Sequence, residues 1–214
     1  NPAVSNLFDP QGPDTNKHGA YVMQMLSGST NKIQYGLATD AKLYLAKTDN
    51  SFSEFRGEQD LWVEAIEWLD SLGVRLINSS LGYSYDFDDP SENYKPEDMN
   101  GKTSVIALAA NMATQEKGMI IVTSIGNEGQ NKNWQVITTP SDAEGVIAVG
   151  AADIDYWIKP SFSSIGPESL AYLKPNVTCP SADGTSFSAP FVTGLIACML
   201  ELSPTLTNRE VKAI

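Results

Sequence analysis

Three residues of this chain have the side-chain types that acyl-transfer chemistry needs. Ser186 ends the tripeptide Gly-Thr-Ser directly before a long apolar stretch, but a serine hydroxyl attacks a carbonyl only when a base takes its proton. His18 is the sole histidine of the chain, and histidine is the usual base at neutral pH. Asn127 lies in a glycine-rich segment, and its amide can donate to a developing oxyanion. These types together indicate nucleophilic catalysis on a carbonyl substrate.

Each of these residues also has an ordinary structural interpretation. A serine near a helix start is usually an N-cap, and an asparagine between glycines usually makes a turn. A lone histidine usually lies on the surface or is satisfied in the core. What favours the catalytic interpretation is the position of the three residues relative to the expected helices and strands.

Hydrophobic periodicity predicts an alternation of helices and strands. Helices are expected to begin at His18 and to cover residues 59–72, 102–117, 184–202 and 207–214. Strands are expected at residues 42–47, 74–79, 119–124, 145–150 and 174–178. Residues 1–16 and 83–100 are expected to be loops. Gly73 is expected to end a helix, and Thr207 with Glu210 should form a capping box.

This order predicts one α/β domain over residues 1–214, a doubly wound and mostly parallel sheet with helices on both faces. Ligands of such sheets bind beyond the carboxyl ends of the strands. Asn127 follows an expected strand, and Ser186 and His18 lie at expected helix N-termini, where free backbone N–H groups favour an oxyanion.

Composition excludes several other classes of function. Asp and Glu outnumber Lys and Arg by 26 to 14, for a net charge of -12, which disfavours nucleic acid and anionic membranes as partners. We expect no apolar run of about 18 residues, and we therefore expect no helix that inserts into a membrane. One histidine and two cysteines exclude a Cys/His zinc site. Cys179 and Cys198 are expected to be buried thiols, with a disulfide between them as the alternative.

Three segments resemble those that carry catalysis in the subtilases, the subtilisin-like serine peptidases. Residues 184–194 read GTSFSAPFVTG and resemble the active-serine segment of that family. Residues 18–22, HGAYV, resemble its histidine segment, and residues 126–129, GNEG, its oxyanion segment. Lesser landmarks occur in the same order, at residues 38–44, 74–82, 146–150 and 162–167. The resemblance covers roughly residues 17–212.

The resemblance implies a subtilisin-like fold and a serine endopeptidase that acts on a peptide or protein substrate. It makes Ser186 the nucleophile, His18 the general base, and Asn127 with the Ser186 N–H the oxyanion donors. An extended substrate would pair with the edge formed by Ser80, Leu81 and Gly82. The first specificity pocket would be walled by Ser124, Ile125 and Gly126.

The chain departs from the family pattern at two places. The family places its catalytic aspartate in Asp-x-Gly at the end of a strand before the histidine, whereas Asp9 and Asp14 stand among prolines and neither is assigned. The catalytic Asp and its strand are therefore expected to be absent from this chain. Only residues 181–183 separate Pro180 from Gly184, so either a family loop is shortened or residues are absent from this sequence.

Further expectations concern the cofactor, the substrate specificity and the location of the protein. No cofactor is identified. Calcium is common in the family, but the carboxylates of residues 83–100 lack calcium-loop spacing and are expected to be solvated. No charge is expected in the specificity pocket, which predicts an apolar or aromatic residue before the cleaved bond. A secreted or periplasmic location is expected from the resemblance alone.

Two other functions stay open at this stage. A catalytically inactive subtilase-like binding module would explain the missing aspartate, although a binding role needs none of Ser186, His18 and Asn127. A general serine hydrolase acting on esters would use the same three residues. The Ser80–Gly82 edge favours an extended peptide over a small ester.

Overall fold

A four-stranded parallel sheet forms the centre of the molecule. In the computed structural model, which describes residues 4–5, 17–50 and 52–214, the strands lie in the order β3-β4-β5-β6. Their bounds are Leu76–Ser79, Ile120–Ser124, Ile147–Ala152 and Val177–Pro180. A second, two-stranded parallel sheet pairs β1 (Val4–Ser5) with β2 (Ala46–Lys47). Every described pairing of named strands is parallel, as the sequence predicts.

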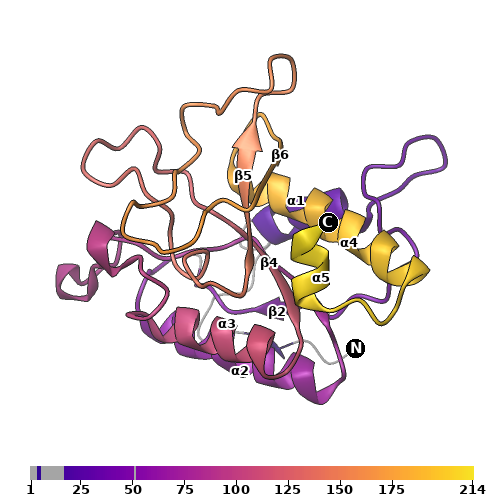
Figure 1. The fold of residues 1–214 in the computed structure, drawn as a ribbon, viewed down its shortest axis with the longest axis horizontal. Coiled ribbons are helices and arrows are strands. Elements are labelled where there is room, and N and C mark those ends of the chain that lie inside the picture. Colours follow the sequence, from indigo (N-terminus) through magenta and orange to yellow (C-terminus); the bar gives the residue numbers. More distant parts are fainter. Residues whose placement is uncertain (1–3, 6–16, 51) are drawn as a thin grey trace.

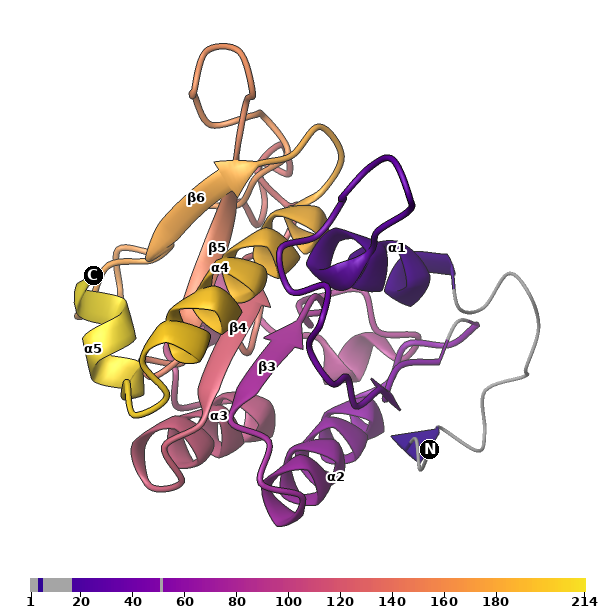
Figure 2. The ribbon, with the colours of Figure 1, turned by 90° about the vertical axis from the view of Figure 1, so that its right-hand side faces the viewer.

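Helices cover both faces of the four-stranded sheet (Figure 1; Figure 2). The helices are α1 (Lys17–Ser27), α2 (Gly57–Ser71), α3 (Val105–Gln115), α4 (Ser188–Leu202) and α5 (Asn208–Ala213). Helix α4 crosses one face, in contact with all four strands, while α2 and α3 pack against each other on the opposite face (Figure 2). The expected doubly wound α/β architecture is confirmed.

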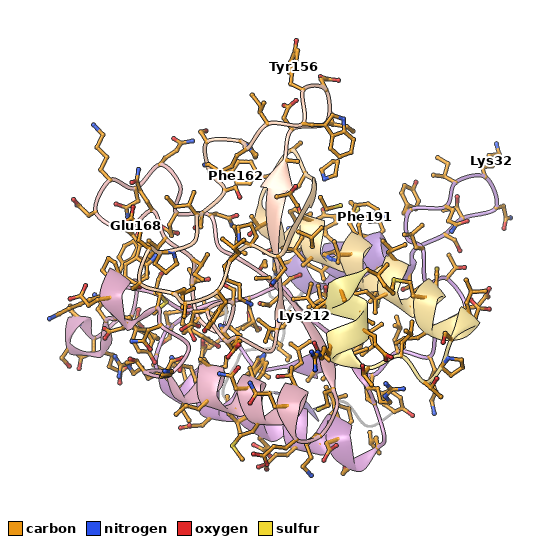
Figure 3. All side chains as sticks on the ribbon, in the orientation of Figure 1. Lys32, Tyr156, Phe162, Glu168, Phe191 and Lys212 are labelled. Carbon is orange, nitrogen blue, oxygen red and sulfur yellow. The ribbon has the colours of Figure 1, made fainter. Side chains whose placement is uncertain are left out.

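The alternation of side chains along β4 builds two cores. Successive residues of a strand point to opposite faces, so Ile120 and Val122 enter the core under α4 and α5 while Ile121 enters the core under α2 and α3. All three side chains are fully buried. Side chains fill the space between the strands and the helices (Figure 3). This continuous apolar run is typical of a strand covered on both faces.

Several element ends agree with the sequence and others are displaced. The Thr207 and Glu210 capping box at α5 is confirmed. The expected helix from residue 184 begins instead with a 3-10 turn, Thr185–Phe187, and α4 proper starts at Ser188. Strand β6 begins at Val177 rather than at Lys174, because Pro175 has no N–H to give to the ladder.

The N-terminal strands differ from the expected ones. Strand β1 falls within the stretch expected to be loop, and the strand expected at residues 42–47 is reduced to β2. Asp9 and Asp14 lie outside the described residues. Helix α1 begins at Lys17, one residue before the expected start at His18.

One apolar segment corrects the sequence analysis. Residues Thr185–Leu202 are long and apolar enough, by length and composition, to cross a membrane, contrary to the expectation that no run reaches about 18 residues. In this structure the segment is the helix that lies across the sheet, and its side chains Ala189 and Ile196 are buried against the strands. Its apolar character therefore has an explanation in the core.

The acidic loop of residues 83–100 is anchored rather than fully solvated. Asp88 and Asp89 are exposed, as expected, but Tyr83, Phe87 and Tyr94 are buried. The Tyr83 and Phe87 rings stack with centroids 6.0 Å apart, and Phe87 meets Tyr94 edge-on at the same distance. Aromatic packing thus fixes a loop that its charges alone would leave in water.

A carboxylate is buried beneath this loop. Glu58, in the first turn of α2, is fully buried, and its Oε1 accepts the Asn50 N–H at 2.5 Å while Oε2 has no hydrogen-bond partner among the described residues. Burial raises the pKa of Glu58 to about 8. The folded state therefore holds a proton that the unfolded chain releases near pH 4.5.

Glu58→Gln should accordingly change the pH dependence of stability. Because the folded pKa lies above the unfolded one, wild-type stability is lost as the pH rises from about 5 to 9, and the neutral amide removes that loss. We expect the variant to be more stable than wild type at pH 9 by at least about 1 kcal/mol. Urea unfolding at several pH values measures this difference. The control is Glu67→Gln, an exposed position of α2, and parallel pH curves for wild type and Glu58→Gln would contradict the assignment.

Candidate active site

The carboxyl ends of three strands bring the predicted segments together. Residues 80–82 follow β3, residues 125–127 follow β4, and the serine turn follows β6 after the short connection 181–183. Carboxyl ends of parallel strands meet at one edge of a sheet. The Ser181 hydroxyl closes this connection by donating to the Gly184 carbonyl at 2.8 Å.

Ser186 is fixed by a reciprocal pair of hydrogen bonds with Ser80. The Ser80 hydroxyl donates to the Ser186 carbonyl at 2.8 Å, and the Ser186 hydroxyl donates to the Ser80 carbonyl at 3.3 Å. Gly184 enters the turn with φ of 86° and ψ of 142°, a conformation that only glycine adopts without strain. Ser186 is half-buried and stands at the N-terminal end of α4, as the sequence predicts.

His18 lies next to the serine turn. It occupies the first turn of α1, is exposed, and its ring centroid is 5.8 Å from that of Phe187, the residue after Ser186. Within the described residues no hydrogen bond joins His18 to Ser186 or to a carboxylate. The structure therefore brings histidine and serine to the same edge without joining them.

Asn127 is oriented by Thr185, a residue that the sequence analysis did not single out. The Thr185 N–H and hydroxyl donate to Asn127 Oδ1 at 2.8 and 3.2 Å. With Oδ1 engaged, Nδ2 is the end of the amide that can donate to a ligand. Thr185 is fully buried, and its place between glycine and Ser186 in the motif was the available signal.

A pocket of about 290 Å³ opens beside these residues. Of the predicted site residues it is lined by Leu81, Gly82, Ser124, Gly126, Asn127 and Ser186. Three predicted residues, His18, Ser80 and Ile125, do not line it. Ile125 is fully buried in the core under α2 and α3, and Ser80 holds Ser186 instead.

Thr138 forms a wall of the pocket that sequence patterns did not reveal. A Cβ at Gly82 would lie 2.2 Å from Thr138 Oγ1, and one at Gly126 would lie 2.8 Å from Thr138 Cγ2. Both glycines are therefore required by the close approach of Thr138. No motif near residue 138 carried this information, because the contact joins three separate segments.

The pocket carries negative charge, which corrects the expectation of an uncharged one. Glu54, Asp86 and Glu128 line it together with Ser186. Burial, with Asp49 and Asp86 nearby, raises the pKa of Glu54 to about 7, and burial with Glu128 nearby raises the pKa of Asp86. Glu128 belongs to the GNEG segment of residues 126–129, whereas no local sequence pattern indicated that Glu54 or Asp86 lines a pocket.

The cysteines and metal candidates add no further site. Cys179 and Cys198 are free thiols, as expected, but half-buried rather than buried. Among the described residues no three His, Cys, Asp or Glu side chains are grouped so that they could hold a metal ion.

The fold and this edge define the class: a parallel α/β protein with a serine turn, an asparagine and a histidine at the carboxyl ends of its strands. The model of the Subtilase family matches residues 5–214, and the chain belongs to that family. It is 32% identical over 208 residues to Subtilisin DY from Bacillus licheniformis, covering 93% of this chain and 69% of that protein. It is 29% identical to the Thermostable alkaline protease of Halalkalibacterium halodurans, covering 95% of this chain.

Length and structure complete the comparison. The chain spans 52% of the alkaline protease and 49% of Subtilisin NAT from Bacillus subtilis subsp. natto, about half the length of these relatives. The S41 Psychrophilic Protease superposes with a TM-score of 0.69 at 24% identity, covering 92% of this chain and 67% of that one. The S218A mutant of the protease domain of PatA gives 0.69 at 20% identity, over 99% and 76%. These likenesses establish the subtilisin-like fold.

Gly184→Ala tests the strained turn before Ser186. The substitution should destabilise the protein by about 1–3 kcal/mol, because an L side chain rarely adopts this φ and ψ. Urea unfolding gives the difference. Gly19→Ala is the matched control, since a Cβ there meets nothing within 4 Å and alanine favours the helix. Equal stability of Gly184→Ala and wild type would show that the turn is not constrained as described.

Proposed function

We propose that this chain is the catalytic part of a serine endopeptidase. The observation that carries the proposal is the shared pocket: Ser186, at the N-terminal end of α4, lines the same cavity as Asn127. His18 lies beside the next residue, Phe187. Membership of the subtilase family supports peptide bonds as the substrate.

The proposed reaction proceeds by acyl transfer. The Ser186 hydroxyl attacks the peptide carbonyl carbon while His18 accepts its proton, and His18 then protonates the leaving amine. Water hydrolyses the resulting acyl-enzyme with His18 again as base. Attack requires the Ser186 hydroxyl to exchange its 3.3 Å hydrogen bond to the Ser80 carbonyl for one to His18.

Charge on the carbonyl oxygen is stabilised by two donors in this proposal. They are Asn127 Nδ2 and the Ser186 N–H. Support for the first comes from the Thr185 hydrogen bonds, which hold Oδ1 and thereby fix the amide before substrate arrives. Such preorganised donors stabilise the transition state more than the ground state. The substrate backbone is proposed to pair with residues 80–82.

Ser186→Ala should abolish hydrolysis of a chromogenic peptide, because the attacking oxygen is removed. Ser71→Ala, at an exposed serine of α2, serves as the matched control and should keep the wild-type rate. Equal rates for Ser186→Ala and wild type would refute the nucleophile assignment. Peptide binding that survives without any hydrolysis in the wild type would favour the inactive binding module.

Asn127→Ala should lower turnover while changing peptide binding little. The expected loss, roughly 10²–10³-fold in kcat, is the value established for an oxyanion donor in a subtilisin. Steady-state kinetics separate kcat from KM, with Asn133→Ala at an exposed site as the control. A rise in KM with kcat unchanged would instead make Asn127 a ground-state binding residue.

The third member of the proposed triad is an aspartate, and no residue of this chain is assigned to that role. An imidazole lacking its orienting carboxylate loses on the order of 10⁴ in turnover. If the 214-residue chain is fully active, Asp9→Asn and Asp14→Asn identify which residue supplies the carboxylate. Export to the periplasm or the medium is proposed on family membership alone.

A further inference from the structure

The pocket beside Ser186 is lined by acidic side chains and by no basic ones. Of its lining residues, Glu54, Asp86 and Glu128 are charged and all three are negative. They come from three separate parts of the chain, before α2, after β3 and after β4. No basic side chain offsets these acidic groups in the lining of the cavity that would receive the substrate.

These carboxylates are not paired with basic side chains of the described residues. Within residues 17–50 and 52–214, none of them forms an ion pair. The nearest basic residue in sequence, Arg56, is engaged elsewhere: its Nε donates to the Glu92 carbonyl at 2.6 Å, and its guanidinium lies 4.1 Å from the centre of the Tyr94 ring. A ligand with positive charge would supply the ion-pair partner that these carboxylates lack among the described residues.

Glu128 is held in position by its neighbours. The Tyr85 hydroxyl donates to Glu128 Oε2 at 2.7 Å and accepts from Asn131 Nδ2 at 2.6 Å. Oε1 has no hydrogen bond among the described residues. A carboxylate with one oxygen fixed and the other open is arranged to accept from a ligand.

The spacing of the carboxylates favours a side chain over a metal ion. No three acidic groups of the described residues are grouped closely enough to hold a metal ion. Carboxylates spread around a cavity suit a long cation whose several N–H donors reach different partners, as in lysine or arginine. A peptide carries such a group on its own side chains.

Resting on the proposed function, we propose that this pocket selects peptides with lysine or arginine on the acyl side of the cleaved bond, within three residues of it, through Glu54, Asp86 and Glu128. This deepens the proposed activity to a class of substrate. It also replaces the apolar residue that the sequence alone favoured.

Paired peptides test the proposal directly. Arginine is compared with citrulline, which has nearly the same shape without the charge, at each of the three positions before the bond. We expect kcat/KM to be at least about tenfold higher for arginine at one of these positions. Glu54→Gln, Asp86→Asn and Glu128→Gln should each reduce this ratio, by roughly threefold to tenfold. Glu201→Gln, an exposed position of α4, removes the same charge and should leave the ratio unchanged.

The pH dependence of the same ratio is a second measurement. Burial, Asp49, Asp86 and Asp88 raise the pKa of Glu54 to about 7, whereas arginine stays charged throughout. The arginine preference should therefore rise between pH 6 and 8, and Glu54→Gln should flatten the rise. Any ionisation that affects both peptides alike cancels in the ratio.

Peptide binding can be measured whether or not the chain is active. Fluorescence anisotropy of the same peptides with Ser186→Ala should show tighter binding of the arginine peptide than of the citrulline peptide. Thermal unfolding of each variant checks that it is folded.

Three outcomes would contradict one or the other proposal. Equal binding and equal kcat/KM at all three positions would overturn the inference while leaving peptide hydrolysis intact. Loss of the preference on adding CaCl₂ alone at constant ionic strength would assign the pocket to a metal and overturn it as well. No hydrolysis of any peptide, with the binding preference retained, would overturn only the proposed function.

Discussion

The packing of α4 across the parallel sheet is the constraint on which the site depends. The helix contacts all four strands of that sheet, and its N-terminal turn is thereby fixed above their carboxyl ends. Ser80, directly after β3, then locks Ser186 with hydrogen bonds in both directions. A serine held by a helix that packs on the sheet and by a strand end keeps its position at little entropic cost when a ligand binds.

The same edge of the sheet supplies the other polar groups. Thr185 ties Asn127 to the serine turn, and Gly82 and Gly126 let Thr138 close the pocket. His18 alone comes from an element outside the four-stranded sheet, the helix α1, and its link to the site is the contact with Phe187. The site is therefore rigid on its serine and asparagine side and less constrained at its histidine.

The pocket beside Ser186 is distinguished by its three carboxylates. A chain with a net charge of -12 has placed three carboxylates around the cavity beside Ser186 and turned Arg56 away from them. Burial, and after it repulsion from neighbouring carboxylates, raises the pKa of Glu54 and of Asp86. A cationic ligand relieves that repulsion, so selectivity and electrostatic strain have the same origin.

The sequence by itself determined the fold class and the capping box at Thr207, and it named Ser186, His18 and Asn127 as candidate site residues, because periodicity and short motifs are local properties of a chain. It could not give the acidic character of the pocket, the role of Thr138 or the interior position of Ile125. Those depend on which segments meet after folding, and residues 54, 86, 128 and 138 share no local pattern. It predicted the exposure of Asp88 and Asp89 but not the buried aromatic contacts that anchor residues 83–100. Tertiary structure decided these points, since the energy of burial and of charge is set by neighbours in space rather than in sequence.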